Sequence, residues 1–88
     1  MSGETRREVT EFAREMESRL RANEHKGGWQ DCASNELLVM LLKEVAELAE
    51  ALYWRASSNE VRREAADVAN FAMMIADPAR KALAGDER

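Results

Sequence analysis

Four carboxylates stand at spacings that could hold a divalent cation. Glu44 and Glu47 are three residues apart, and Glu64 and Asp67 repeat this spacing further along the chain. Side chains three residues apart project from the same face of a helix, so each pair could present its two carboxylates together. Hard oxygen ligands suit Mg²⁺, or Mn²⁺ as a substitute, and Mg²⁺ keeps coordination positions open for water and substrate phosphate. The spacing therefore indicates metal-dependent phosphate chemistry.

Asp67 is the least ordinary of these acids, because in a helical projection it lies beside Phe71 and Met74 on an apolar face. A buried carboxylate is costly without a partner, and several together also repel one another. A bound metal ion would offset the cost of burying these carboxylates, and the same carboxylates would give the site affinity for the metal. The alternative is surface decoration, since 34% of the residues are charged and ordinary ion pairs with Arg or Lys could satisfy the acids.

The segment "HKGGW", residues 25–29, contains residue types that suit a nucleotide. Lys26 could pair with a phosphate, Trp29 could stack on a base, and the glycines allow the backbone to approach a ligand closely. The alternative is that Trp29 packs under the loop and Lys26 is solvated. Both interpretations are left open by the sequence.

The elements that must position these residues are predicted to be helices. One proline and four glycines leave little material for turns, and good helix formers dominate. Apolar residues at three- and four-residue spacing predict a first helix, paired glycines interrupt it, and Ser or Asn caps open the next two. A short link makes the second and third helices antiparallel neighbours. The expected helices cover about 4–23, 36–55 capped by Ser34 or Asn35, 60–77 capped by Ser57 or Ser58, and a short "PARKALAG" helix that Pro78 begins and Gly85 ends.

The length of 88 residues predicts one domain, 1–88, with a modest core. A core of this size needs help from a metal, a disulfide or self-association, and a single cysteine, Cys32, excludes a disulfide within one chain. Three short helices with wide apolar faces would expose a large patch as a monomer. We therefore expect at least a homodimer.

Composition also excludes several classes of partner. Thirteen Lys and Arg against 17 Asp and Glu give a net charge of −4, which argues against binding to a nucleic-acid polymer. No apolar run approaches the roughly 20 residues that span a bilayer, and the polar start "MSGETRREVTEF" lacks the apolar core of a signal peptide. A lone cysteine fits a reducing compartment. The expectation is a soluble cytoplasmic protein without a membrane partner.

The acidic pairs carry a family resemblance. "KEVAELAEA" followed by "REAADVANFAMMIAD" resembles the E-x-x-E then E-x-x-D signature of MazG-like all-α nucleoside triphosphate pyrophosphohydrolases, and "HKGGW" is similar to a loop of their short phage-type members. The resemblance covers residues from about 23 to 77. It implies an all-α fold: a bundle of three main helices plus a short C-terminal helix, completed by association into homodimers or homotetramers with a four-helix-type core.

The same resemblance implies Mg²⁺-dependent hydrolysis of a (d)NTP to a (d)NMP and pyrophosphate. Carried over by position, Glu44, Glu47, Glu64 and Asp67 would be the metal ligands, and Asn70 would hold substrate or a metal-bound water. Glu47 or Glu44 would position or deprotonate the attacking water. Base and sugar preference, dimer against tetramer, and biological role are left open.

Two other functions are compatible with these residues. One is a non-catalytic helical module for oligomeric interaction or regulation, in which the four acids pair with Arg and Lys across a subunit interface. The other is a phosphoribosyl-ATP pyrophosphohydrolase of the same superfamily. The similarity of "FAMMIAD" to the MazG-like pattern favours a MazG-like nucleoside triphosphate pyrophosphohydrolase over a phosphoribosyl-ATP pyrophosphohydrolase.

Overall fold

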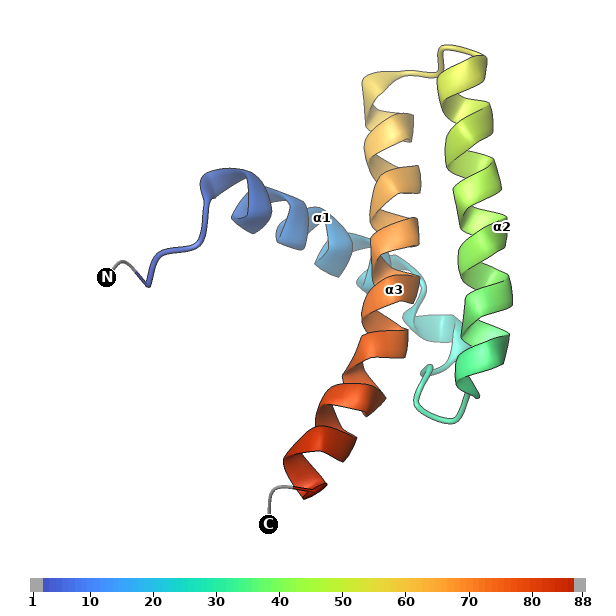
Figure 1. Cartoon of the computed structure of the whole chain (residues 1–88). Helices are drawn as coiled ribbons and strands as arrows, with labels where there is room; N and C mark the ends of the chain where they lie inside the picture. Colours follow the sequence, from blue (N-terminus) through green and yellow to red (C-terminus); the bar gives the residue numbers. More distant parts are fainter. Residues whose placement is uncertain (1–2, 87–88) are drawn as a thin grey trace.

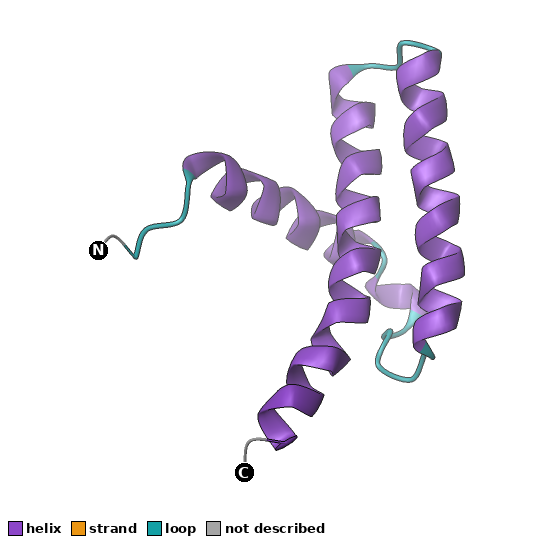
Figure 2. Cartoon of the chain, in the orientation of Figure 1, coloured by secondary structure: helices purple, strands orange, loops and turns teal. Residues whose placement is uncertain are grey.

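A computed structural model describes residues 3–86, and every regular element in this range is a helix (Figures 1 and 2). The order is α1 (Arg7–Ala22), the short 3-10 helix η1 (Glu24–Lys26), α2 (Ser34–Tyr53) and α3 (Ser58–Asp86). The all-α prediction is confirmed for these residues. The ends of the predicted domain, 1–2 and 87–88, lie outside them. None of the described helices is both long and apolar enough to cross a membrane.

The link between α2 and α3 is a tight turn that makes the two helices antiparallel (Figure 1). Arg55 adopts the left-handed conformation, with φ of 54°, and the amide of Ala56 donates to the carbonyl of Ala51 at 2.8 Å. This pattern closes the end of α2 as a Schellman motif does. The Ser57 hydroxyl then accepts the amide of Glu60 at 3.1 Å, which confirms Ser57 as a predicted cap of α3. The two E-x-x-E/D segments consequently run side by side.

The start of α2 differs from the prediction. Neither Ser34 nor Asn35 is the N-cap, because the helix begins at Ser34 and Ala33 occupies the N-cap position. Ala33 has no side-chain acceptor, and the carboxylate of Glu36 reaches back to accept its amide at 2.9 Å. This contact is half of a capping box, and it satisfies an exposed amide from inside the helix.

The predicted break at Pro78 is wrong, as is the separate short helix after it. The helix α3 runs without interruption from Ser58 to Asp86, past the predicted stop at Gly85. Pro78 removes one backbone donor and crowds the preceding turn, which bends a helix, and Figure 1 shows the last part of α3 slanting away from its upper part. Arg80 and Lys81 each contact the carboxylate of Asp77 at 3.0 Å, so two ion pairs span the proline.

The helix α1 packs across α3 (Figure 1). Its observed range lies within the predicted 4–23, and the paired glycines follow it as expected. Three contacts fasten it to α3: the ion pair of Arg62 with Glu15 at 3.3 Å, and contacts of Asp67 and Asn70 that belong to the site. The helix thus closes one side of the α2–α3 hairpin.

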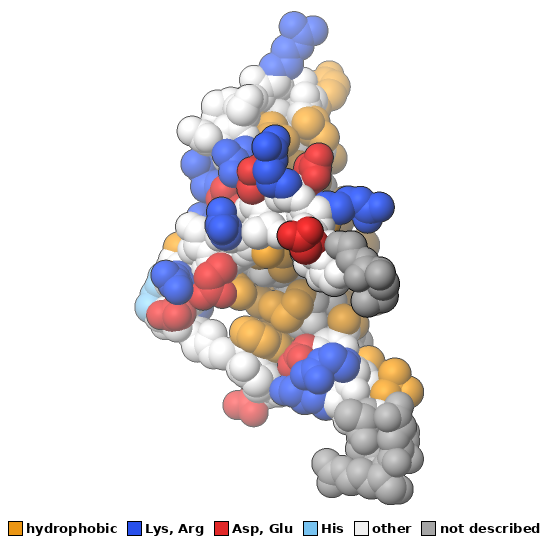
Figure 3. Space-filling model, turned by 90° about the vertical axis from the view of Figure 1, so that its left-hand side faces the viewer, with side chains coloured by type: hydrophobic (Ala, Val, Ile, Leu, Met, Phe, Trp, Pro, Cys, Tyr) orange, Lys and Arg blue, Asp and Glu red, His pale blue; other side chains and the backbone are white. Residues whose placement is uncertain are grey.

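Few apolar side chains are fully buried within one chain. Among residues 3–83, the buried apolar residues are Leu37, Ala51 and Ala66. Large apolar side chains remain exposed on the outer side of α2, and Figure 3 shows apolar side chains gathered between charged ones on another face. One outer stripe of α2 has alternating spacings of four and three residues: Leu38, Leu42, Val45, Ala49 and Leu52. We call these five residues the outer stripe.

Candidate metal centre and nucleotide pocket

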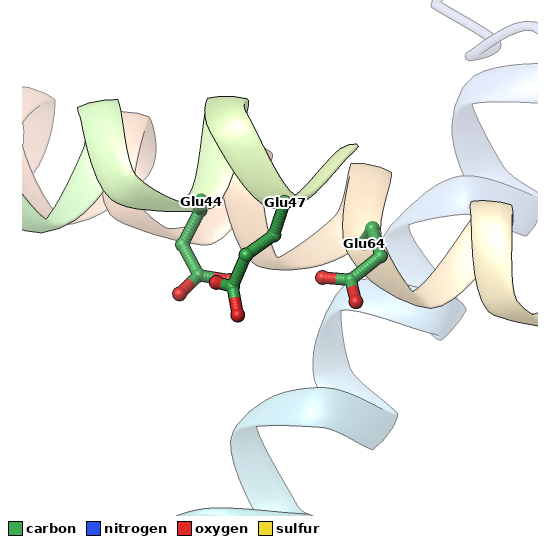
Figure 4. Close-up of side chains that lie close together, drawn as sticks. All are labelled: Glu44, Glu47 and Glu64. Atoms are coloured by element: carbon green, nitrogen blue, oxygen red, sulfur yellow. The ribbon is translucent and has the colours of Figure 1, made fainter. Parts of the chain in front are cut away.

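Three of the four predicted metal ligands converge. Glu44 and Glu47 extend from α2 toward Glu64 of α3 (Figure 4), and one carboxylate oxygen from each lies within 4.8 Å of the other two. We call these residues the acidic triad. All three side chains are half-buried, because they lie along the edge where α2 and α3 meet. An acidic cluster on helices does not by itself define a metal site, so its electrostatics and surroundings must be considered.

Burial and, to a smaller extent, mutual repulsion disfavour the charged form of the triad. Burial raises the pKa of Glu44 to about 7, with further contributions from its hydrogen bond to Glu47 and from repulsion by the neighbouring acids. Burial likewise raises the pKa of Glu64, and repulsion by Glu47 and Asp67 adds to the effect. The triad therefore retains a proton at pH values where an isolated carboxyl has lost it. A divalent cation that binds there competes with that proton.

The raised pKa of Glu44 predicts that the metal-free protein loses stability as pH rises. The pKa of Glu44 is raised from 4.5 to about 7, so the folded state binds more protons than the unfolded state between these values. The free energy of unfolding should then fall as pH increases through that window. Urea denaturation in EDTA at a series of pH values measures the slope, and Glu44→Gln should flatten it. A slope that is identical in wild type and Glu44→Gln would contradict the assignment.

Asp67 does not join the triad. Its two carboxylate oxygens accept from Nε of Arg19 at 3.0 Å and from Nη2 of Arg19 at 3.2 Å, a two-pronged ion pair between α3 and α1. The sequence prediction did not include Arg19. A signal for it was available, because Arg19 lies three residues after Met16 and seven after Phe12, on the apolar side of its helix. The carboxylate of Asp67, which was expected to bind a metal ion, is instead paired with the guanidinium of Arg19.

A pocket of about 680 Å³ lies among α1, the following loop and the α2–α3 hairpin. Its apolar wall includes Leu37, Phe71 and Met74, and its basic side chains are those of Arg19, Lys26 and Lys43. Five of the seven predicted site residues line it: Lys26, Trp29, Glu44, Asp67 and Asn70. Glu44 also belongs to the acidic triad, so the triad meets the pocket at this residue.

The loop after α1 places Lys26 and Trp29 on the pocket wall. Gly27 has φ of 92°, a conformation that side chains disfavour, so glycine is required where the loop reverses. The amide of Cys32 donates to the carbonyl of Trp29 at 2.9 Å and closes the next turn. Trp29 is half-buried whereas Lys26 is exposed, which leaves the ammonium free to meet a ligand.

Asn70 lies on the pocket wall one turn beyond Asp67, and it is 4% exposed. Its Nδ2 donates to the carbonyl of Met16 at 3.0 Å, which links α3 to α1 and fixes the orientation of the amide. Its Oδ1 is buried and has no hydrogen-bond partner among the described residues. Buried polar atoms are almost always satisfied, so an orphan acceptor beside a pocket points to a donor that a ligand or water would supply.

No protein-family model matches this chain, and neither a curated protein nor a solved structure is significantly similar to it. The site combines an acidic triad, a pocket with three basic side chains, a half-buried tryptophan and an orphan acceptor.

Proposed function

We propose that this chain is a Mg²⁺-dependent nucleoside triphosphate pyrophosphohydrolase that cleaves a (d)NTP into a (d)NMP and pyrophosphate. The observation that carries the proposal is the position of Glu44, which belongs both to the acidic triad and to the wall of the pocket that Lys26 and Trp29 line. A cation at the triad would stand at the side of a pocket whose residue types suit a nucleotide.

The donor set fits the proposed ion. Carboxylate oxygens are the ligands that Mg²⁺ prefers, and Mn²⁺ accepts the same set. The three residues that would hold the ion each offer a carboxylate oxygen, and these oxygens lie within 4.8 Å of one another. When bound, the ion would neutralise negative charge and polarise the phosphoryl group that is attacked.

Each pocket residue has a role in this proposal. Trp29 stacks on the base, and Lys26 pairs with a phosphate. The orphan Oδ1 of Asn70 accepts a hydrogen bond from a sugar hydroxyl or a bound water, since an acceptor can bind only a donor. Glu44 is the triad carboxylate on the pocket wall, so it is the one placed to orient the attacking water and take its proton.

We also propose that the active protein is a homodimer in which the outer stripe packs against a second copy. Spacings of four and three residues that alternate along a helix form the seam of a coiled coil, and the partner must present a similar seam. A second copy supplies this seam. Two α2–α3 hairpins joined along their outer stripes would complete a four-helix core and bury the apolar surface that one chain leaves exposed. A homotetramer would need a further interface.

The second candidate is a non-catalytic helical module. The ion pair of Asp67 with Arg19 favours it, because such a module is expected to satisfy its acids with basic side chains. The pairing lies within one chain and covers one acid of four. Glu44, Glu47 and Glu64 form no ion pair among residues 3–86. A phosphoribosyl-ATP pyrophosphohydrolase would use the same site and differ in substrate.

Thermal melting separates the enzyme from the module. A ligand that binds only the folded state stabilises it, and the metal also relieves repulsion within the triad. Saturating Mg²⁺ with a non-hydrolysable nucleotide should raise the melting midpoint by about 5 °C or more for a chain of this size. Ca²⁺-free, Mg²⁺-free buffer with EDTA is the reference. A melting midpoint that neither Mg²⁺ nor the nucleotide changes would support the non-catalytic module.

A further inference from the structure

The ion pair of Arg19 with Asp67 is built into the pocket wall. Both residues line the pocket, and their side chains are 28% and 18% exposed. The pair joins α1 to α3 across 48 positions of sequence, with two nearly parallel hydrogen bonds of 3.0 and 3.2 Å. Two parallel bonds fix the plane of a guanidinium as well as its position. The geometry of Arg19 is therefore set by Asp67.

Asp67 uses only some of the N–H donors of the Arg19 guanidinium. Arginine carries five N–H groups and no acceptor. Asp67 accepts one from Nε and one from Nη2. The other three, on Nη1 and Nη2, have no partner within the described part of the chain. A guanidinium held along one edge by a carboxylate presents its other edge as a rigid anion-binding fork, and phosphate oxygens match that fork.

Arg19 and the acidic triad are connected through the pocket. Glu44 of the triad lines the same pocket as Arg19 and Lys26. A phosphate chain held by a cation at the triad would therefore extend into a pocket that the guanidinium of Arg19 also lines.

We propose that Arg19 is the principal triphosphate-binding residue of the pocket and that Asp67 is its positioning residue, which leaves the metal to Glu44, Glu47 and Glu64. This inference rests on the proposed function. It assigns to Asp67 a role different from the metal ligand that the family resemblance implies. Asp67 acts on the substrate only through the arginine that it holds.

The deciding variant removes the pair without changing net charge: Arg19→Met combined with Asp67→Asn. Electron paramagnetic resonance measures Mn²⁺ binding to the protein in the absence of triphosphate. Calorimetry measures the binding of inorganic triphosphate in the presence of Mg²⁺. Triphosphate affinity should fall about 10-fold or more, the effect of losing charge-assisted hydrogen bonds. Mn²⁺ affinity should stay within about threefold of wild type, because no metal ligand is lost. Arg7→Met combined with Glu11→Gln removes an exposed ion pair of the same helix, again without changing net charge, and as the matched control should change neither.

Adding Asp67→Asn to Arg19→Met tests the positioning role of Asp67. In an Arg19→Met background, Asp67→Asn should cost no further triphosphate affinity, because Asp67 acts through Arg19. If Asp67→Asn there lowers Mn²⁺ affinity about 10-fold, as loss of a ligand does, Asp67 is a metal ligand and the inference is wrong.

Since the pair fastens α1 to α3, the milder Arg19→Lys keeps a cation and removes the fork. It should weaken triphosphate binding several-fold and leave Mn²⁺ binding unchanged. Wild-type triphosphate affinity in Arg19→Lys would overturn the inference. These are binding readouts, so a chain that binds triphosphate as described and hydrolyses no nucleotide would refute the proposed function and leave this inference standing.

Discussion

Replacement of Glu64 by glutamine is expected to lower Mg²⁺-dependent pyrophosphate release at least about 100-fold. Glutamine has nearly the same shape but cannot offer an anionic oxygen, so the triad loses one of its three charges. Metal-free stability should not fall, because the substitution removes a carboxylate whose pKa is raised by burial and by repulsion from its neighbours. A steady-state pyrophosphate assay and a urea titration in EDTA measure the two effects.

The matched control for Glu64→Gln is Glu60→Gln. Glu60 is on the same helix one turn earlier, it is exposed, and it is not part of the triad. The same chemical change there should leave turnover within about twofold of wild type, as for a substitution away from any site. If Glu64→Gln retains wild-type activity, the triad does not hold the catalytic metal. If both variants lose activity, a general loss of negative charge explains the result and the site assignment fails.

The second large effect concerns self-association. Leu42 is the most exposed large apolar residue of the outer stripe, at 61% in one chain, so arginine fits there in a monomer but would be buried in the proposed dimer. An unpaired charge buried at an interface is strongly destabilising. Leu42→Arg should weaken dimerisation at least about 100-fold, as removal of an interface hot spot does. Sedimentation velocity over a range of concentrations measures it.

Leu83 provides the control for that variant. It is 65% exposed, nearly the same as Leu42, but it lies near the end of α3. Leu83→Arg adds the same charge at a matched exposure and should leave the dimer intact. A wild-type chain that sediments as a monomer would contradict the proposed interface. So would a dimer that tolerates Leu42→Arg and is disrupted by Leu83→Arg.

The sequence was sufficient for what depends on local spacing. Spacing on single helices and a short link between them predicted that Glu44, Glu47 and Glu64 would meet, and the structure brings them together. The partner of Asp67 was not predicted, because Arg19 comes from a helix 48 positions away whose crossing angle the pattern does not specify. An acid inside an apolar stripe signals a buried partner, but it does not say whether that partner is a metal or a guanidinium.

The apolar stripe of α2 shows a second limit of pattern reading. The sequence suggested one wide face. In the structure Leu37 of that face is buried inside the chain, its neighbours Leu41 and Leu48 are half-buried, and the rest is exposed: Leu38, Val45 and Leu52. A helical projection gives the width of an apolar face but not how many neighbours cover it. Pro78 is a comparable case, because residue type predicted a break and the structure has a continuous helix through it, with ion pairs from Asp77 to Arg80 and Lys81 on either side of the proline.

The arrangement of the site suggests a division of labour between its two halves. The α2–α3 hairpin carries the acidic triad, while α1 and its loop carry Arg19, Lys26 and Trp29. The separation of charge is not complete, because Lys43 of α2 and Glu17 and Glu24 of the α1 side also line the pocket. In the proposed reaction the hairpin holds the metal and the attacking water, and the α1 side holds the triphosphate and the base.

Phosphorus NMR of the reaction products tests whether hydrolysis occurs between the α- and β-phosphates. The wild-type chain is incubated with each canonical NTP and dNTP, with Mg²⁺ and with EDTA, and the phosphorus resonances are followed over time. At least one nucleotide should give a monophosphate and pyrophosphate in equal amounts, only with Mg²⁺. Intact nucleotides throughout the panel, or a diphosphate with orthophosphate as products, would contradict the proposed hydrolysis.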